Sequence, residues 1–241
     1  MAVLGHARAL VCALGITGSL LLAGCGGGTA GGAAGKAAAA GGTAVGNDVL
    51  VKTLKYGDAA FGTPGTATAT PGMGGGYTLD PSDPATPNGG KAGQIKFADN
   101  GTSVPFWFPG TTGNTGIMIN AGGTGGFTVP PGKYKAMNVL TSGVYGAGVA
   151  DVTFTYSGGT GTAQFTSDDW CNGSPTDGVV AWMAQTRLSP DGSQDGNACG
   201  MDVDTVAVDG TKTLQSVKVD SDPANGAQNV IVIMAVTLTK A

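Results

Sequence analysis

Apolar and polar residues alternate in short runs along most of the second half of the chain, with turn residues between the runs. The run DVTFTY (residues 151–156) is typical, because Val152, Phe154 and Tyr156 fall on one face of an extended strand and the threonines on the other. A Ser-Gly-Gly turn follows, and the run TAQFT then returns. This pattern predicts a β-hairpin.

Runs of the same kind predict further short strands, about ten in all. They lie at residues 94–97, 104–108, 116–120, 126–129, 133–140, 203–210, 214–220 and 229–240. Pro130, Pro131 and Gly132 separate two of these runs and predict a turn. Residues 230–236 are almost continuously apolar, which predicts a central strand buried on both faces. We therefore expect an all-β fold of the sandwich or jelly-roll type.

The N-terminal region predicts an export signal and a lipid anchor. His6 and Arg8 carry positive charge, an apolar run spans residues 9–22, and small residues follow, which is the layout of a secretory signal peptide. The sequence Leu-Ala-Gly-Cys at residues 22–25 resembles the bacterial lipobox, in which the cysteine receives a diacylglyceryl group and becomes the new N-terminus. The resemblance implies that residues 1–24 are removed and that Cys25 anchors the protein in a lipid bilayer, at the cell membrane or outer membrane and outside the cytoplasm. An ordinary secretory signal with a cysteine nearby by chance is the alternative.

The residues after this cysteine predict a tether and then one folded domain. Residues 25–47 are mostly Gly, Ala and Thr, which cannot bury enough apolar surface to offset the entropy of ordering them. We expect a flexible Gly/Ala-rich tether here and a β-sandwich domain over residues 48–241. Residues 63–93 are rich in Pro, Gly, Thr and Asp and predict a long irregular segment within that domain.

Composition excludes several classes of chemistry. Every acidic residue is aspartate, and the single histidine, His6, lies in the predicted signal peptide. The mature protein would thus contain no histidine and no glutamate. This excludes Ser-His-Asp and Cys-His nucleophile systems and histidine-based zinc sites. Asp168 and Asp169 are adjacent and point to different faces, so we expect turn chemistry rather than catalysis, and no enzyme. The net charge of −4, without a basic block, argues against a nucleic-acid partner.

Two cysteines remain once Cys12 is removed with the signal and Cys25 carries lipid. Outside the cytoplasm we expect Cys171 and Cys199 to form a disulfide, with a pair of free thiols as the alternative. The loop between them is rich in turn residues, so a crosslink would stabilise the fold by about 3 kcal/mol in the chain-entropy model.

Several motifs follow one another in a recognisable order. They are FWFP at residues 106–109, VPPGKYKAMNVL at 129–140, GVADVTFTYSGGT at 148–160 and FTSDDWC at 165–171, with closing strands at 212–219 and 230–238. Together they resemble the galactose-binding-like β-sandwich modules that accompany glycoside hydrolases in secreted bacterial proteins. The resemblance covers residues 61–241. It implies a jelly roll, often with a structural calcium ion, that binds a polysaccharide or other glycan without catalysing a reaction.

A sugar site needs an aromatic ring for the apolar face of the sugar and polar groups for its hydroxyls. Our first choice is the polar loop between the paired cysteines, with Trp182, Arg187 and Asp177. Tyr145, flanked by glycines in SGVYGAG, is the second choice. Trp107 is a further candidate, because it lies between two phenylalanines on a predicted strand and must face away from them.

Two other functions stay open at this point. The domain could be a structural or adhesive envelope protein that binds a protein partner and has no sugar site. A lipoprotein enzyme that uses aspartates alone is the least favoured alternative.

Overall fold

The computed structural model describes residues 46–68, 72–99, 101–173, 178–222 and 229–241, all within the second of two compact units, Ala39–Ala241. The predicted signal peptide, Cys25 and nearly all of the predicted tether lie outside the described residues. The described part is built of β-strands and one 3-10 turn, η1 (Pro87–Gly90), without an α-helix. The predicted all-β sandwich is therefore confirmed, while its assignment to the jelly-roll family stays a prediction.

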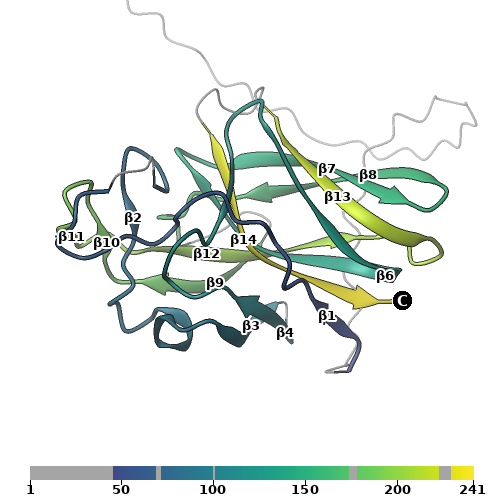
Figure 1. Cartoon of the computed structure of the whole chain (residues 1–241), viewed down its shortest axis with the longest axis horizontal. Coiled ribbons are helices and arrows are strands. Elements are labelled where there is room, and N and C mark those ends of the chain that lie inside the picture. The colour runs from purple at the N-terminus through teal and green to yellow at the C-terminus, as the bar shows by residue number, and fades with distance from the viewer. Residues whose placement is uncertain (1–45, 69–71, 100, 174–177, 223–228) are drawn as a thin grey trace, which may run out of the picture. The chain divides into compact units, whose positions relative to one another are not determined.

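Most strands belong to one nine-stranded antiparallel assembly, in which β1-β14-β6-β13-β7-β8 is the continuous path (Figure 1). β12 pairs with β6 and β9, and β5 pairs with β14 beside β1. A hairpin of β3 and β4 and a small sheet of β2, β10 and β11 complete the domain. The strands are β1 (Asp48–Leu50), β2 (Thr78–Leu79), β3 (Gly93–Asp99), β4 (Thr102–Phe108), β5 (Ile117–Ile119), β6 (Thr124–Val144), β7 (Gly148–Tyr156), β8 (Gly159–Ser167), β9 (Val179–Ala184), β10 (Arg187–Leu188), β11 (Gln194–Asp195), β12 (Cys199–Ala207), β13 (Thr213–Ser221) and β14 (Val230–Lys240).

Strand β6 is 21 residues long and belongs to two sheets. Its first half pairs with β13, and its second half lies between β12 and β14. The turn predicted at Pro130–Pro131–Gly132 is confirmed, because the chain reverses direction there between the half that pairs with β13 and the half that pairs with β14. The far ends of the two halves meet again, since Gly125 lies against Ile119, and Ile119 pairs with Ile231, the partner of Gly143. The prolines cannot donate ladder hydrogen bonds, and the register with β13 shifts opposite them. The Tyr134 hydroxyl donates a hydrogen bond to the Pro130 carbonyl over 2.7 Å. The Tyr134 ring packs against Gly132, where a Cβ would lie only 2.8 Å from the ring and would clash with it.

The central sheet is buried on both faces, and two hydrophobic clusters result. On β14, Ile231 and Ile233 pack into the cluster beneath β7, β8 and β13, whereas Val232 and Met234 pack into the cluster beneath the β3–β4 hairpin. The prediction of a central strand at residues 230–236 is confirmed. Figure 1 shows the resulting layers, with β14, β12 and the second half of β6 between β7, β8 and β13 on one side and β3 and β4 on the other.

The hairpin predicted from DVTFTY and TAQFT is also confirmed. β7 and β8 pair in unbroken register from Tyr156 opposite Gly159 to Gly148 opposite Ser167. Val152, Phe154 and Tyr156 are buried, as the alternation predicts.

The segment predicted to be irregular carries little regular structure over its described residues, but it is well packed. Met73 and Leu79 are buried in the second cluster. Asp80 and Asp83 each accept a backbone N–H two residues further on, from Ser82 and Ala85, both over 2.8 Å. The DPSDP sequence thus forms two Asx turns, a role for which aspartate is well suited.

We predict that Ile233→Ala lowers the free energy of unfolding by about 2–5 kcal/mol, because the side chain is 1% exposed and its removal leaves a cavity between two sheets. Urea denaturation of the purified protein measures this. Lys96→Ala on the exposed face of β3 is the control and should change stability by less than about 0.5 kcal/mol. A loss below about 1 kcal/mol for Ile233→Ala would contradict the central position of β14.

Candidate functional site

The disulfide predicted between Cys171 and Cys199 is present. It joins the segment after β8 to the first residue of β12, and Cys199 is buried while Cys171 is partly exposed. The loop that it closes carries β9, β10 and β11, which the sequence analysis did not predict. The apolar run VVAWMA at residues 179–184 was the available signal for β9, but turn residues surround it.

Arg187, on β10, is held beside this disulfide by several groups. Its guanidinium donates to Asp195 Oδ2 from Nε over 3.2 Å and from Nη2 over 3.0 Å. It lies 4.0 Å above the centre of the Tyr77 ring, and its Nη1 is 3.6 Å from Cys171 Sγ. The hydrogen bond and charge of Arg187 hold the pKa of Asp195 below its usual value. The arginine is thus oriented by an aromatic ring and a carboxylate, a rigid arrangement for a residue that remains partly exposed.

Tyr145 directly follows the end of β6 and is the exposed large hydrophobic side chain of the described surface, at 54%. Its backbone has φ of 65°, a left-handed conformation that an aromatic residue seldom adopts. Such strain persists where surrounding contacts impose it, and it is concentrated at functional sites. Here the Tyr145 side chain packs against Gly74 and Gly75. A Cβ added to Gly74 would lie 3.2 Å from the Tyr145 ring, and one added to Gly75 would lie 3.4 Å from its hydroxyl.

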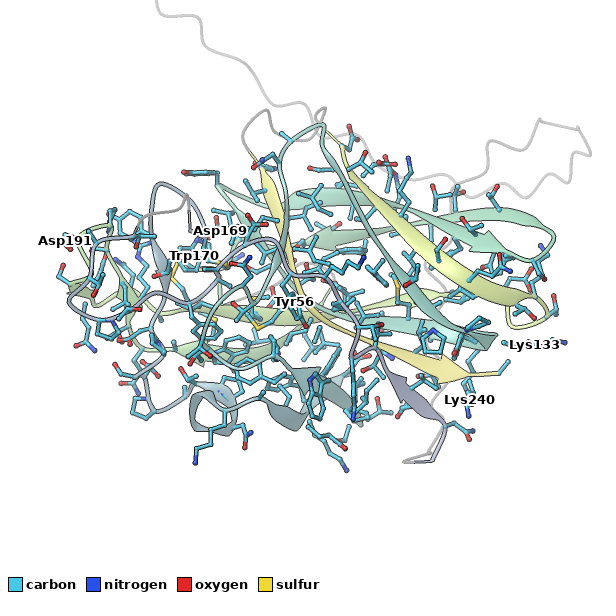
Figure 2. The ribbon with its side chains drawn as sticks, in the orientation of Figure 1. Tyr56, Lys133, Asp169, Trp170, Asp191 and Lys240 are labelled. Carbon is cyan, nitrogen blue, oxygen red and sulfur yellow. A yellow bond between two sulfur atoms is a disulfide. The ribbon has the colours of Figure 1, made fainter. Side chains whose placement is uncertain are left out.

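Asp169 connects the turn at Tyr145 to the disulfide. Its Oδ2 accepts the Gly146 N–H over 2.8 Å, and its Oδ1 accepts the Cys171 N–H over 2.9 Å. This is the hydrogen-bonding role that the sequence favoured for the Asp168–Asp169 pair. In Figure 2, Asp169 and Trp170 lie near each other, far from Lys133 and Lys240.

These groups form one surface, which we call the Tyr145 surface and define as Tyr77, Tyr145, Asp169, Arg187 and Asp195. Gly75 links its two tyrosines, since a Cβ at that glycine would lie 3.4 Å from the Tyr145 hydroxyl and 3.9 Å from the Tyr77 ring. The surface combines an exposed aromatic face with a guanidinium and two carboxylates. Rings cover apolar patches of a ligand, and the charged groups accept and donate hydrogen bonds at its edges.

The structure brings two of the predicted ligand residues, Tyr145 and Arg187, to this surface and places the others elsewhere. Trp182 is 7% exposed and stacks on Phe97 at 6.0 Å within the second cluster, so its ring does not face solvent. β9 pairs with β12 beneath the β3–β4 hairpin, and burying Trp182 fills that interface. Trp107 faces away from Phe106 and Phe108, as predicted, and lies under the Lys52 ammonium at 4.1 Å. Asp177 lies outside the described residues.

The two aspartates of the DPSDP turns, Asp80 and Asp83, are engaged by protein donors. Asp80 accepts from Ser82, Thr186 and Gln194, and Asp83 accepts from the backbone of residues 85, 185 and 186. Burial alone would raise the pKa of Asp80, but the hydrogen bonds from Ser82, Gln194 and Thr186 outweigh it and lower that pKa. Among the described residues, no three acidic, histidine or cysteine side chains are grouped as metal ligands.

Asp202 and Asp168 are 4% and 2% exposed and lie near enough to repel each other. Burial, and then the charge of Asp168, raise the pKa of Asp202 to about 7. A substrate in solvent has no access to carboxyls buried this deeply. We interpret Asp202 as a group that couples the stability of the domain to pH.

Comparison with known proteins adds no relative: no family model matches the chain, and no curated protein matches it significantly. The described residues contain no helix of the length and hydrophobicity that a membrane span requires.

We predict that the free energy of unfolding falls as pH rises from 4 to 8. A folded pKa of about 7, above the unfolded value, means that the contribution is complete below pH 4 and is lost as pH rises through 7. The loss should be on the order of 3 kcal/mol, and Asp202→Asn should abolish most of it. Urea denaturation at several pH values measures the effect. Asp151→Asn, at a surface strand position, should leave the slope intact, and a wild-type curve that is flat over this range would contradict the prediction.

Proposed function

We propose that this protein is a surface lipoprotein, anchored through Cys25, whose non-catalytic β-sandwich binds carbohydrate at the Tyr145 surface. The observation that carries the binding proposal is Tyr145 itself. A tyrosine that is both 54% exposed and held at positive φ is costly for folding, and glycine or asparagine would be tolerated better. A ligand that stacks on the ring gives a reason for keeping it.

The surroundings of Tyr145 support a sugar more than a purely apolar ligand. Arg187 and Asp195 are oriented by each other, and Asn197 donates to Asp195 at the exposed edge. A planar ring beside fixed donors and acceptors is the combination that sugar hydroxyls and the apolar face of a pyranose require. The Asp195 charge balances that of Arg187, which favours a neutral glycan over an acidic one.

The lipid anchor is supported by the sequence alone. The four residues Leu-Ala-Gly-Cys follow an apolar run and a positively charged start. A diacylglyceryl group supplies two acyl chains, which is sufficient for stable anchoring.

We predict that Tyr145→Ala weakens glycan binding about tenfold or more, the cost of losing one stacked ring. Binding of the full chain to a polysaccharide panel, by pull-down and then calorimetry, measures this. Tyr145→Phe keeps the ring and should retain affinity. Tyr145→Asn should preserve or raise the unfolding free energy, because asparagine tolerates positive φ, and yet lose binding.

Two outcomes would contradict the glycan proposal. Equal glycan affinity for wild type and Tyr145→Ala would remove the site from this surface. Silent glycans together with saturable binding to a protein partner would favour the adhesive or structural alternative.

We predict that Cys25→Ser abolishes incorporation of a labelled fatty acid and moves the protein from the membrane fraction to the soluble fraction. Metabolic labelling in a bacterial host followed by fractionation measures both. Cys12→Ser, within the predicted signal, is the matched control and should remain labelled. Labelling that persists in Cys25→Ser would exclude the anchor at this residue.

A further inference from the structure

Strand β8 forms the outer edge of its sheet. It closes the path β6-β13-β7-β8, and β7 is its ladder partner among the described strands. Thr160, Thr162 and Gln164 are exposed, while Phe165 faces the core. Figure 1 shows β8 beside β7 at the boundary of this layer.

This edge lacks the features that usually prevent pairing with another chain. Natural edge strands are short, or carry charge or proline. β1 is three residues long and includes Asp48, and β3 carries Lys96 and Asp99. β8, in contrast, has nine residues, GTGTAQFTS, without a charge or a proline.

The outward hydrogen-bonding groups of β8 can be assigned from its register. Tyr156 and Gly159 flank the two-residue turn and form its hydrogen-bonded pair, after which such pairs recur at every second residue. Gly161, Ala163 and Phe165 therefore direct their backbone N–H and C=O toward β7. Thr160, Thr162 and Gln164 direct theirs away from the sheet, and these are the exposed residues.

We propose that β8 is a homodimer interface, at which the β8 strands of two copies pair antiparallel about a two-fold axis at Thr162. In this register Thr162 lies opposite its own copy and Thr160 lies opposite Gln164. All three outward residues then pair, with about six ladder hydrogen bonds. Threonine pairs across strands are favourable, and an uncharged strand opposes no like charges when it meets itself.

The neighbouring charges are compatible with this pairing. Gln164 Nε2 donates to Asp151 on β7 over 2.5 Å, so that carboxylate lies one strand inward from the edge. Lys218 and Asp220, further inward on β13, form an ion pair at 2.6 Å. The outward residues of β8 itself carry no charge, so like charges do not meet where the two edges pair. A self-complementary, neutral edge fits a second copy of the chain better than it fits a charged peptide.

The test compares charge at the edge with the same charge on an inner strand. Sedimentation equilibrium of the full chain in detergent should show a reversible dimer. Thr162→Lys places two ammonium groups opposite each other and should raise the dimer dissociation constant at least about tenfold. Gln215→Lys, exposed on β13 between β6 and β7, should leave it unchanged.

A crosslink tests the register. Paired residues at the axis have Cα atoms about 5.5 Å apart, within reach of a disulfide. Thr162→Cys should therefore give a 162–162 crosslink, identified by mass spectrometry, and Thr160→Cys should give far less. A wild-type protein that stays monomeric at high micromolar concentration would overturn the proposal. So would a dimer that Thr162→Lys does not weaken, which would place the interface elsewhere.

Discussion

The pairing of β14 with the second half of β6 is the interaction on which the rest of the domain depends. It runs from Val230 opposite Val144 to Lys240 opposite Tyr134 and forms the centre of the middle layer. Because both faces of this pair are covered, neither hydrophobic cluster could form without it. The turn at Pro130–Gly132 joins this half of β6 to the half that pairs with β13, so one chain segment links the layers on the two sides of the first cluster.

The Tyr145 surface lies where the end of that long strand meets two other strand ends. Gly143 accepts the Trp170 N–H over 2.8 Å, and the Trp170 carbonyl accepts the Gly200 N–H over 2.6 Å. These bonds fix the end of β6, the segment after β8 and the start of β12, and the disulfide joins the last two. Gly143 permits the approach, since a Cβ there would lie 2.5 Å from the Ser167 carbonyl oxygen. The position of Tyr145 is therefore a consequence of how the middle layer ends.

Local pattern sufficed for the features that depend on neighbours in sequence. Alternation predicted the β7–β8 hairpin and the orientation of Trp107, and a continuous apolar run predicted the buried β14. The Pro-Pro-Gly sequence predicted the turn within β6, and the number of cysteines outside the signal and lipid anchor predicted the disulfide. Local pattern did not suffice where contacts with segments distant in the sequence determine the position of a side chain. The residues around Trp182 have the composition of a binding loop. Its burial depends instead on packing against Phe97, which lies 85 residues earlier in the chain.

The restriction of the acidic residues to aspartate has a structural explanation. Six aspartates accept the backbone N–H of the residue two positions further on: Asp80, Asp83, Asp169, Asp191, Asp195 and Asp209. The aspartate side chain is the right length to close this turn, and its hydrogen bonds satisfy the loop backbone. Six of the sixteen acidic residues thus hold loops between short strands. Two of these aspartates, Asp169 and Asp195, belong to the Tyr145 surface, so the same turns that hold the loops also fix the positions of its polar groups.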